Sequence, residues 1–512
     1  MKKISVLKAF SSVTSVILIS KIMGFVKQMI TASNFGATLE TDLISLSEGF
    51  IGNAQYVLVH VLLTSVSSVY IYLKKDDELE AKRFAVDIGK AFGIISGAVV
   101  SLILLFAPAL AKLIAPTYTQ ENSAALANYL RIFSPTLILF SMGAIFNAVL
   151  SANKRFIPGQ LAGMIQSVIL IICVLTLKPI LGVNVLAVGF LAYVIVDTLF
   201  LGIVSKPYWK LSRGNPFSSA AVRQQLRMAG PLFVGYSMIY INQLVGKVLI
   251  SGLETGSVTA MGYASVLSNL VSTIISSFCG ILAPYITNRV VNTEEKKAAD
   301  IVTRAANIMT LTFLPITILT VVCSVDVVTI VFGRGAFNTQ NIQVAARALA
   351  GYAISFVPMV LRGLYGQIQY SYQNSKAPMI NSSIGIVVNI ILSIILCPLY
   401  GVWGVTFASS VSVIICGVLN VITARKCNSH LRFLPLLRSL PLMVIGGVAC
   451  AAIAVWIQNA SWANSPLLRF GLATVIGGIA YLLIVSPMLL RLLRNHKQKV
   501  SNPSNQEGTE AE

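Results

Sequence analysis

Fourteen long apolar segments run through this chain, and no other feature restricts its fold as strongly. A helix crosses a hydrocarbon layer of about 30 Å with roughly 20 residues, and each segment is long enough to do so. A backbone inside lipid must satisfy its own hydrogen bonds, so the segments predict an all-α polytopic membrane protein with about 14 transmembrane helices. Their predicted limits are 10–33, 40–72, 86–115, 124–152, 157–177, 182–205, 222–252, 256–288, 300–332, 340–372, 378–399, 402–424, 436–458 and 466–490.

The composition supports this class. Of the 512 residues, 56% are hydrophobic and only 11% are charged, whereas average soluble chains carry about 25% charged residues. The net charge of +20 therefore does not indicate nucleic-acid binding, because Lys and Arg collect in the cytoplasmic loops of membrane proteins. The 7 cysteines show no CxxC spacing and the 3 histidines are scattered, so we expect no metal site and no cofactor.

The loops between the segments alternate in charge. Every second loop is basic, while the others carry almost no Lys or Arg apart from Lys178 and Arg334. By the positive-inside rule this alternation predicts that both termini are cytoplasmic. The basic loops contain Lys74, Lys75, Lys82, Arg83, Lys154, Arg155, Lys206, Lys210, Arg213, Arg223, Arg289, Lys296, Lys297, Arg425, Lys426, Arg432 and Arg438.

The first two segments carry charged residues at membrane depth. Lys27 lies roughly 13 Å along the helix from a turn at Gly36, near the middle of the hydrocarbon layer. An ammonium there is costly unless it faces protein or water. Lys27 and Lys21 therefore extend to the lipid headgroups, form buried structural ion pairs, or line a cationic cavity for an anionic substrate. Asp42 and Glu48, early in the second segment, are predicted to balance these charges or to help gating; Glu48 either neutralises Lys27 or titrates during transport.

An internal repeat relates the two halves of the chain. A shift of 220 residues matches Gly36 with Gly256, and it also matches Lys27 with Lys247. Parallel repeats are common in secondary transporters, whose substrate sites lie where the halves meet. The predicted plan is two six-helix lobes in parallel repeat plus two C-terminal helices. Its parts are an N-terminal lobe (1–205), a basic cytoplasmic linker (206–221), a C-terminal lobe (222–425), the last two helices (426–495) and a disordered cytoplasmic tail (496–512).

Two further basic residues are candidates for substrate binding. The repeat places Lys247 at the depth of Lys27; the alternative is that Lys247 pairs with a nearby acid such as Glu254. Arg362 lies inside the tenth segment, where it either joins the cavity or ends a helix at the membrane surface.

The sequence contains no recognisable catalytic constellation. It has no Walker loop, no HExxH motif, and no nucleophile with a base at a known spacing. We therefore expect a protein that is not an enzyme and needs no ATPase subunit. A membrane-bound glycosyl-transfer enzyme is disfavoured because the short outer loops leave no room for an acidic or metal-binding site.

Several motifs, taken in order, resemble those of the MurJ/MviN family of lipid II flippases. This family belongs to the superfamily of multidrug, oligosaccharidyl-lipid and polysaccharide exporters, and the resemblance covers most of the chain. The matching stretches are Ser20–Lys27, Asn34–Gly36 followed by Thr41 and Asp42, Gly333–Phe337, and Tyr372–Pro378.

The resemblance implies movement of an undecaprenyl-pyrophosphate-linked saccharide from the inner to the outer leaflet by alternating access. It also implies a multi-pass protein of the bacterial inner membrane, which contacts membrane lipids and acts as a monomer. The last two helices would hold the lipid tail. Lys21 and Lys27 take the places of essential cavity arginines, which keeps the charge but loses the bidentate guanidinium, and Asp42 matches the family's acid.

Two departures from the family pattern leave the cargo open. An arginine of the family's second helix maps near Gln55, and the Tyr-Ala-Asp-Arg-x-x-Glu pattern of its eighth helix reads Tyr263–Asn269 here, without the charges. Lipid II is the predicted cargo. Another lipid-linked oligosaccharide, for exopolysaccharide, capsule or O-antigen, is the alternative, and a cation-coupled multidrug exporter is a weaker one because such a protein needs acids rather than lysines.

Overall fold

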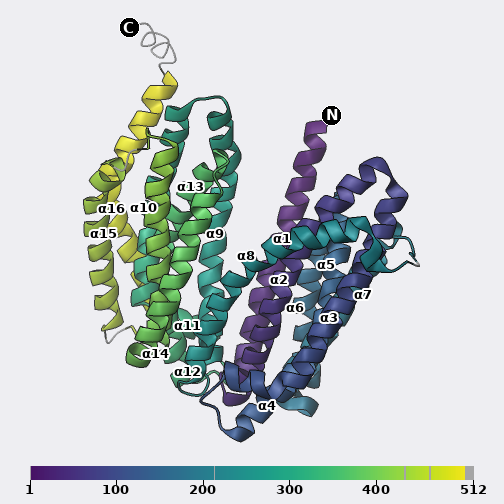
Figure 1. Ribbon diagram of the computed structural model, residues 1–512. Coiled ribbons are helices and arrows are strands. Elements are labelled where there is room, and N and C mark those ends of the chain that lie inside the picture. The colour runs from purple at the N-terminus through teal and green to yellow at the C-terminus, as the bar shows by residue number, and fades with distance from the viewer. Residues whose placement is uncertain (1, 213, 432–433, 461–462, 502–512) are drawn as a thin grey trace. The chain divides into compact units, whose positions relative to one another are not determined.

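A computed structural model describes residues 2–212, 214–431, 434–460 and 463–501, and every regular element within these ranges is a helix (Figure 1). The prediction of an all-α fold is confirmed for them. Packing divides the chain into two compact units. Unit 1 contains Met1–Val266, Phe332–Ala345 and Ile390–Val405, and unit 2 contains Leu267–Val331, Ala346–Asn389 and Thr406–Glu512.

Unit 1 is built mainly from the helices of the first half of the chain. Short 3-10 turns, η1 (Gly182–Asn184), η2 (Lys206–Tyr208) and η3 (Pro216–Ser218), lie in its connections. Its α-helices are α1 (Lys2–Phe35), α2 (Leu39–Asp76), α3 (Glu78–Ile114), α4 (Gln120–Phe133), α5 (Thr136–Ala152), α6 (Ile157–Leu181), α7 (Val185–Ser205) and α8 (Ala220–Ser251).

Local sequence explains where these helices begin and end. Thr38 caps α2 in a reciprocal box, in which the Thr38 N–H donates to Thr41 Oγ1 at 2.8 Å and the Thr41 N–H donates to Thr38 Oγ1 at 3.4 Å. Asp77 caps α3 by accepting from the backbone N–H of Leu79 at 2.7 Å. Pro135 separates α4 from α5, since a proline has no N–H to continue the helical ladder.

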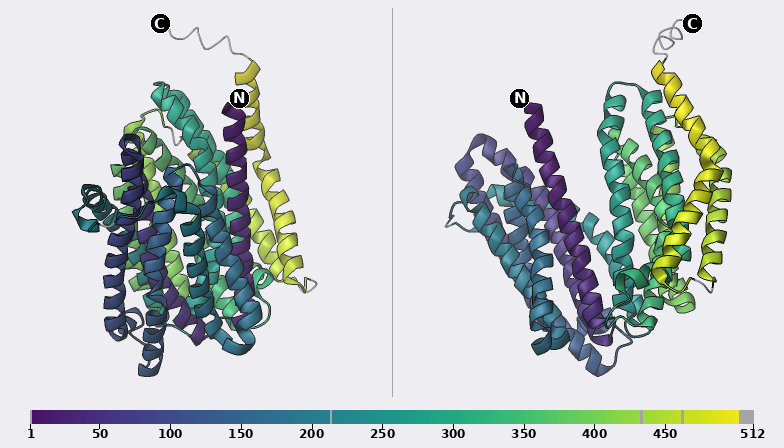
Figure 2. Two further views of the ribbon diagram at one scale, coloured as in Figure 1. Left: turned by 90° about the vertical axis from the view of Figure 1, so that its right-hand side faces the viewer. Right: turned by 180° about the vertical axis from the view of Figure 1, so that it is seen from behind.

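Unit 2 contains most of the second half of the chain. Its helices α10, α15 and α16 pack side by side (Figure 2). The helices of the second half are α9 (Ser257–Val291), α10 (Glu295–Val322), α11 (Ser324–Phe332), α12 (Thr339–Ala353), α13 (Phe356–Ser371), α14 (Lys376–Cys427), α15 (Leu434–Gln458) and α16 (Pro466–Ser501). Unit 1 takes α9 up to Val266, Phe332 of α11, α12 up to Ala345, and the middle of α14 from Ile390 to Val405. The long α14 is two helices joined at a kink, where Gly401 has φ 59° and ψ −137°.

All fourteen predicted segments fall on helices. Three of them are interrupted once, between α4 and α5, α10 and α11, and α12 and α13, and two share α14. Within the described residues, 10 helical stretches are long and apolar enough to cross a membrane. Predicted spans α1 and α8 are outside this set, and each of them carries several Lys or Arg residues.

One detail differs from the predicted plan. The sequence predicted a disordered tail from residue 496 onward. Helix α16 instead continues to Ser501, so residues 496–501 are helical. The rest of the predicted tail, 502–512, lies outside the described residues. The predicted lobe limits stay a prediction, because the compact units follow packing rather than the repeat.

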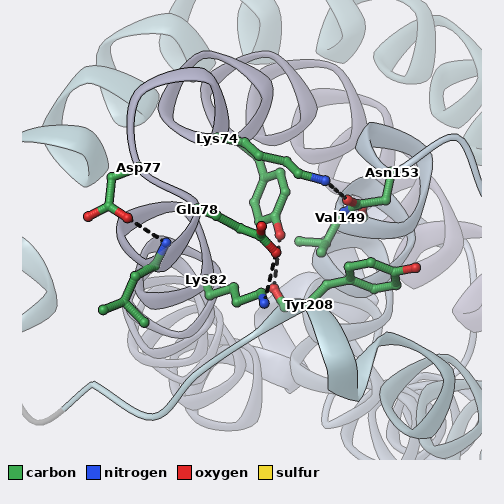
Figure 3. Close-up of polar contacts among 9 residues, drawn as sticks. Lys74, Asp77, Glu78, Lys82, Val149, Asn153 and Tyr208 are labelled. Atoms are coloured by element: carbon green, nitrogen blue, oxygen red, sulfur yellow. Dashed lines mark hydrogen bonds and ion pairs between the residues drawn. The ribbon is translucent and has the colours of Figure 1, made fainter.

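Three basic loops meet at one end of unit 1. The Lys74 ammonium donates to Asn153 Oδ1 at 2.5 Å, which joins the last turn of α2 to the loop after α5 (Figure 3). The backbone N–H of Lys210 donates to the carbonyl of Lys82 at 3.0 Å, which brings in the linker after α7. Lys82 also pairs with Glu78 at 2.9 Å (Figure 3). Loops that the charge pattern assigns to one side of the membrane therefore lie together.

Candidate functional site

Unit 1 encloses a cavity of about 500 Å³. Helices α1, α2, α6, α7, α8 and the start of α9 supply its walls. Part of the wall is aromatic: Phe190 of α7 packs edge-on against Phe133 and Phe140, with ring centroids 4.8 Å and 6.1 Å apart. The polar and charged residues that line the cavity include Lys27, Gln28, Thr31, Ser45, Glu48, Asn53, Gln55, His60, Gln166, Lys247, Thr259 and Ser265.

The two lysines that the repeat relates line this same cavity. Lys27 comes from α1 and Lys247 from α8. The Lys247 ammonium lies against α2, where it donates to the Ser45 carbonyl at 3.4 Å. This close approach requires Gly49, because a Cβ at that position would be 2.1 Å from Lys247 Nζ. The structure therefore places both lysines on the wall of one cavity.

Glu48 of α2 also lines the cavity, and it is exposed. Its charge attracts that of Lys247. In the part of the chain that the structure describes, however, Glu48 forms no ion pair with either lysine. The cavity thus carries two cations and one anion without direct pairing, so part of its positive charge is available to a ligand.

Asp42 has a different environment. It is 2% exposed, and its carboxylate accepts from the backbone N–H of Gly256 at 2.7 Å and of Thr259 at 2.8 Å. These are donors at the start of α9, where the helix dipole favours a negative charge. Asp42 does not line the cavity. It ties the start of α2 to the start of α9.

The turns that precede α2 and α9 each contain a glycine with a positive φ. Gly36 and Gly256, which the repeat matches, have φ of 64° and 87°, values that favour glycine. A Cβ on Gly36 would be 2.4 Å from the carbonyl oxygen of Ala336, and one on Gly256 would be 2.4 Å from that of Ala37. Both glycines therefore allow backbone segments to touch, and the matched glycines of the repeat have matched roles.

The remaining predicted binding residues lie elsewhere. Lys21 is exposed on α1 and is not among the residues that line the cavity. Arg362 is exposed on α13, in unit 2. Among the described residues Lys247 forms no ion pair with Glu254, whose carboxylate accepts a hydrogen bond from Gln340 Nε2 at 3.3 Å. Substrate roles for Lys21 and Arg362 stay predictions.

Sequence reasoning missed several cavity residues. Tyr56, His60, Asn53 and Gln166 line the cavity beside the charges, and none was predicted as a site residue. One signal was present: Asn53, Tyr56 and His60 lie three to four residues apart, a spacing that places them on one face of α2. Gln55, which replaces a family arginine, also lines the cavity.

This fold and cavity define a multi-pass helical membrane transporter. The family model described as "Lipid II flippase MurJ" matches residues 31–470. The chain belongs to this family, as the motifs of its sequence predicted.

Individual relatives are distant but cover most of the chain. A protein of Borreliella burgdorferi named "Probable lipid II flippase MurJ" is 24% identical, over 86% of this chain and 88% of its own. One of Rhizobium tropici with the same name is 23% identical, over 94% of this chain and 92% of its own.

The fold has solved counterparts. A structure titled "Lipid II flippase MurJ, inward closed conformation" matches with a TM-score of 0.79 and 20% identity, covering 94% of this chain and 99% of that one. An inward-facing multidrug transporter of the MATE family matches with a TM-score of 0.67 and 14% identity, covering 80% and 95%. At these identities the likeness concerns the fold. The chain is accordingly a multi-pass protein of the bacterial inner membrane.

Proposed function

We propose that this protein is a flippase for lipid II. It would move this undecaprenyl-pyrophosphate-linked saccharide from the inner to the outer leaflet by alternating access, without a chemical step. Membership of the lipid II flippase family supports the class of activity. The observation that carries the assignment to a site is the single cavity that Lys27 and Lys247 line together with Glu48.

The charges fit the head of the proposed substrate. A pyrophosphate carries several acceptor oxygens, and hydrogen bonds between ionised partners are stronger than neutral ones. Two ammonium groups from α1 and α8 present separate point charges to it, and they adapt to different orientations more readily than a guanidinium fork. In this proposal Lys27 and Lys247 bind the anion, Lys21 receives it on the way in, and the lipid tail stays in the bilayer.

We also propose that both termini face the cytoplasm and that a single chain carries out transport. The gathering of basic loops at one end of unit 1 supports the orientation, because hydrogen bonds join the α2–α3 connection, which carries Lys74 and Lys82, to the connections after α5 and after α7 (Figure 3).

Net transport in one direction requires an energy source or removal of the product. A ligand shifts an alternating-access equilibrium only by its difference in affinity for the two states. We propose the membrane potential as the source, since moving one charge is worth about 2.3 kcal/mol per 100 mV. Among the described residues, Lys27, Lys247 and Glu48 form no ion pair with one another. The net charge of the cavity therefore changes with the charge of the ligand that binds there.

A second candidate cargo is another lipid-linked oligosaccharide. The observation that favours it is the neutral lining where the family carries charges, since Gln55, Ser265 and Val266 all line the cavity. Loss of these charges reduces the number of fixed contacts with the substrate head. The class of activity and the lysine site are the same for both cargoes.

The test is rescue of a bacterium depleted of its own lipid II flippase. We expect the wild type to restore growth, while Lys27→Met and Lys247→Met, which keep the aliphatic volume, fail at equal membrane levels. Lys112→Met, on an exposed lysine of α3 outside the cavity, is the matched control and should restore growth. Failure of a well-expressed wild type would contradict lipid II as the cargo, and rescue by both cavity variants would contradict the site.

A further inference from the structure

Four aromatic rings from two helices meet in unit 1. On α2 the rings of Tyr56 and His60 lie 3.8 Å apart between centroids. On α8 Tyr240 lies 4.7 Å from Tyr56, and Tyr236 stacks on His60 at 5.4 Å with an angle of 19° between the planes. Each helix contributes two rings four residues apart, so each pair shares one face of its helix.

The two rings of α2 face the cavity, and the two of α8 hold them. Tyr56 and His60 line the cavity, whereas Tyr236 and Tyr240 do not. The tyrosines of α8 instead pack on the buried side chains of Val57, Val61 and Ala229. The result is a supported aromatic surface at the cavity wall.

Packing of α2 on α8 does not by itself explain Tyr56. Its side chain is 46% exposed, although a ring that serves only as packing would be largely buried. Tyrosine combines an apolar ring face with a polar hydroxyl, which suits a partly open wall that meets a ligand. Pockets for organic ligands commonly combine aromatic walls with a few placed polar groups.

The aromatic surface is separated from the charges along one helix. With about 1.5 Å of rise per residue, Tyr56 lies about 12 Å from Glu48 along α2, and His60 about 18 Å. The carboxamides of Asn53 and Gln55 lie between them on the wall. A ligand that reaches from the charges to the rings must therefore have an anionic part, a polar middle and a flat apolar face.

We propose that Tyr56 and His60 form a subsite for a pyranose ring of the transported lipid. The apolar C–H face of the sugar would lie on these rings, and its hydroxyl and amide groups would bond to Asn53 and Gln55. A pyrophosphate without sugars makes no use of this surface. The inference rests on the proposed function, because it takes Lys27 and Lys247 as the site of the pyrophosphate.

The experiment compares two probes on the purified full-length protein in nanodiscs. One probe is lipid II, and the other is undecaprenyl pyrophosphate, which lacks the sugars and the peptide attached to them. We expect the wild type to bind lipid II more tightly than undecaprenyl pyrophosphate. Tyr56→Leu should weaken lipid II binding about fivefold, as expected for loss of one aromatic contact, and leave undecaprenyl pyrophosphate unchanged.

Two variants control for the ring and for the helix. Tyr56→Phe keeps the ring and should retain the preference for lipid II to within about twofold. Tyr72→Leu removes a tyrosine of α2 that is 64% exposed and outside the cavity, and it should change neither affinity. Retention by Phe together with loss by Leu identifies the aromatic face as the cause.

The outcomes separate this inference from the proposed function. Equal loss of both affinities in Tyr56→Leu, or no loss of either, would overturn the sugar subsite while leaving the pyrophosphate site in place. A wild type that binds both probes equally would do the same. A wild type that binds neither would contradict the proposed function, and the subsite with it.

Discussion

A buried carboxylate in unit 2 and the cavity charges in unit 1 differ in whether they form ion pairs within the protein. In unit 2, Asp326 of α11 is 1% exposed and pairs with Arg469 of α16, whose Nη2 lies 2.8 Å from Asp326 Oδ1. Arg469 Nε donates to the same oxygen at 3.2 Å, and Gln458 of α15 donates to the other oxygen. In unit 1, the charges of Lys27, Lys247 and Glu48 line an open cavity without direct pairing.

We propose that this difference distinguishes a charge with a structural role from charges that bind the substrate. Both oxygens of Asp326 accept hydrogen bonds within the protein, and Asp326, Arg469 and Gln458 together join the helices α11, α16 and α15. A charge left without a partner inside a membrane protein costs free energy, and it persists where it contacts a substrate or an ion. We therefore expect variants of the unit 2 pair to lose stability, and variants of the unit 1 lysines to lose binding.

The largest effect should come from Asp326→Ala. This variant leaves the Arg469 guanidinium partly buried without its partner, which should lower the free energy of unfolding by about 3 kcal/mol. Thermal unfolding of the purified protein measures it. Glu78→Ala, which breaks an exposed pair with Lys82, should change the melting temperature little. Equal effects of the two substitutions would remove the distinction between the pairs.

A smaller effect, of a different kind, should come from Lys247→Met. Loss of one charged contact should weaken binding of undecaprenyl pyrophosphate about tenfold. The melting temperature should stay the same or rise, because the variant removes a charge that lacks an ionic partner. Titration and thermal unfolding on one preparation measure both quantities. A clear fall in melting temperature with unchanged affinity would make Lys247 a structural residue.

Asp42→Asn sharpens the comparison within α2. The amide offers one acceptor oxygen in place of two charged ones at the start of α9, so the free energy of unfolding should fall by about 1 kcal/mol. Affinity for undecaprenyl pyrophosphate should stay within about twofold of wild type. A loss of affinity as large as that of Lys247→Met would place Asp42 in the substrate site instead.

The smallest effect concerns a loop pair and depends on pH. Hydrogen bonds from Lys297, at 2.7 Å, and from Arg289 lower the pKa of Glu294 below its ordinary 4.5. The folded state thus holds this proton less tightly than the unfolded state, so the pair stabilises above pH 4.5 and loses its effect as the pH falls through the lowered pKa. Glu294→Gln should lower the melting temperature slightly at neutral pH, with the difference shrinking in acid; a constant difference would contradict the ionic origin.

Much of the fold followed from hydrophobicity alone. Lipid imposes long apolar helices, and this constraint made the helical segments readable to within several residues. The sequence did not predict that α14 continues through Gly401. Two apolar spans separated by a glycine have the same sequence pattern whether a loop or a kink joins them. The helical end of α16 was also not predicted, because the segments were identified by their apolar residues and this end of the helix is polar.

The sequence predicted only part of the site. The repeat related Lys27 to Lys247, and the structure places both on one cavity. The pairing of Asp326 with Arg469 was not predicted, because 143 residues separate them and neither residue's local sequence indicates the other. The same limit applies to the rings of α8 that support Tyr56 and His60, since each helix shows its own spacing but not its neighbour.

The most direct test of the account is translocation of lipid II in proteoliposomes by the double variant Lys27→Met/Lys247→Met, with thermal unfolding measured on the same preparation. We predict that wild-type protein moves lipid II between leaflets. The variant should show the translocation rate of protein-free liposomes and keep the wild-type melting temperature. Translocation by the double variant at the wild-type rate would contradict the claim that these lysines carry the substrate.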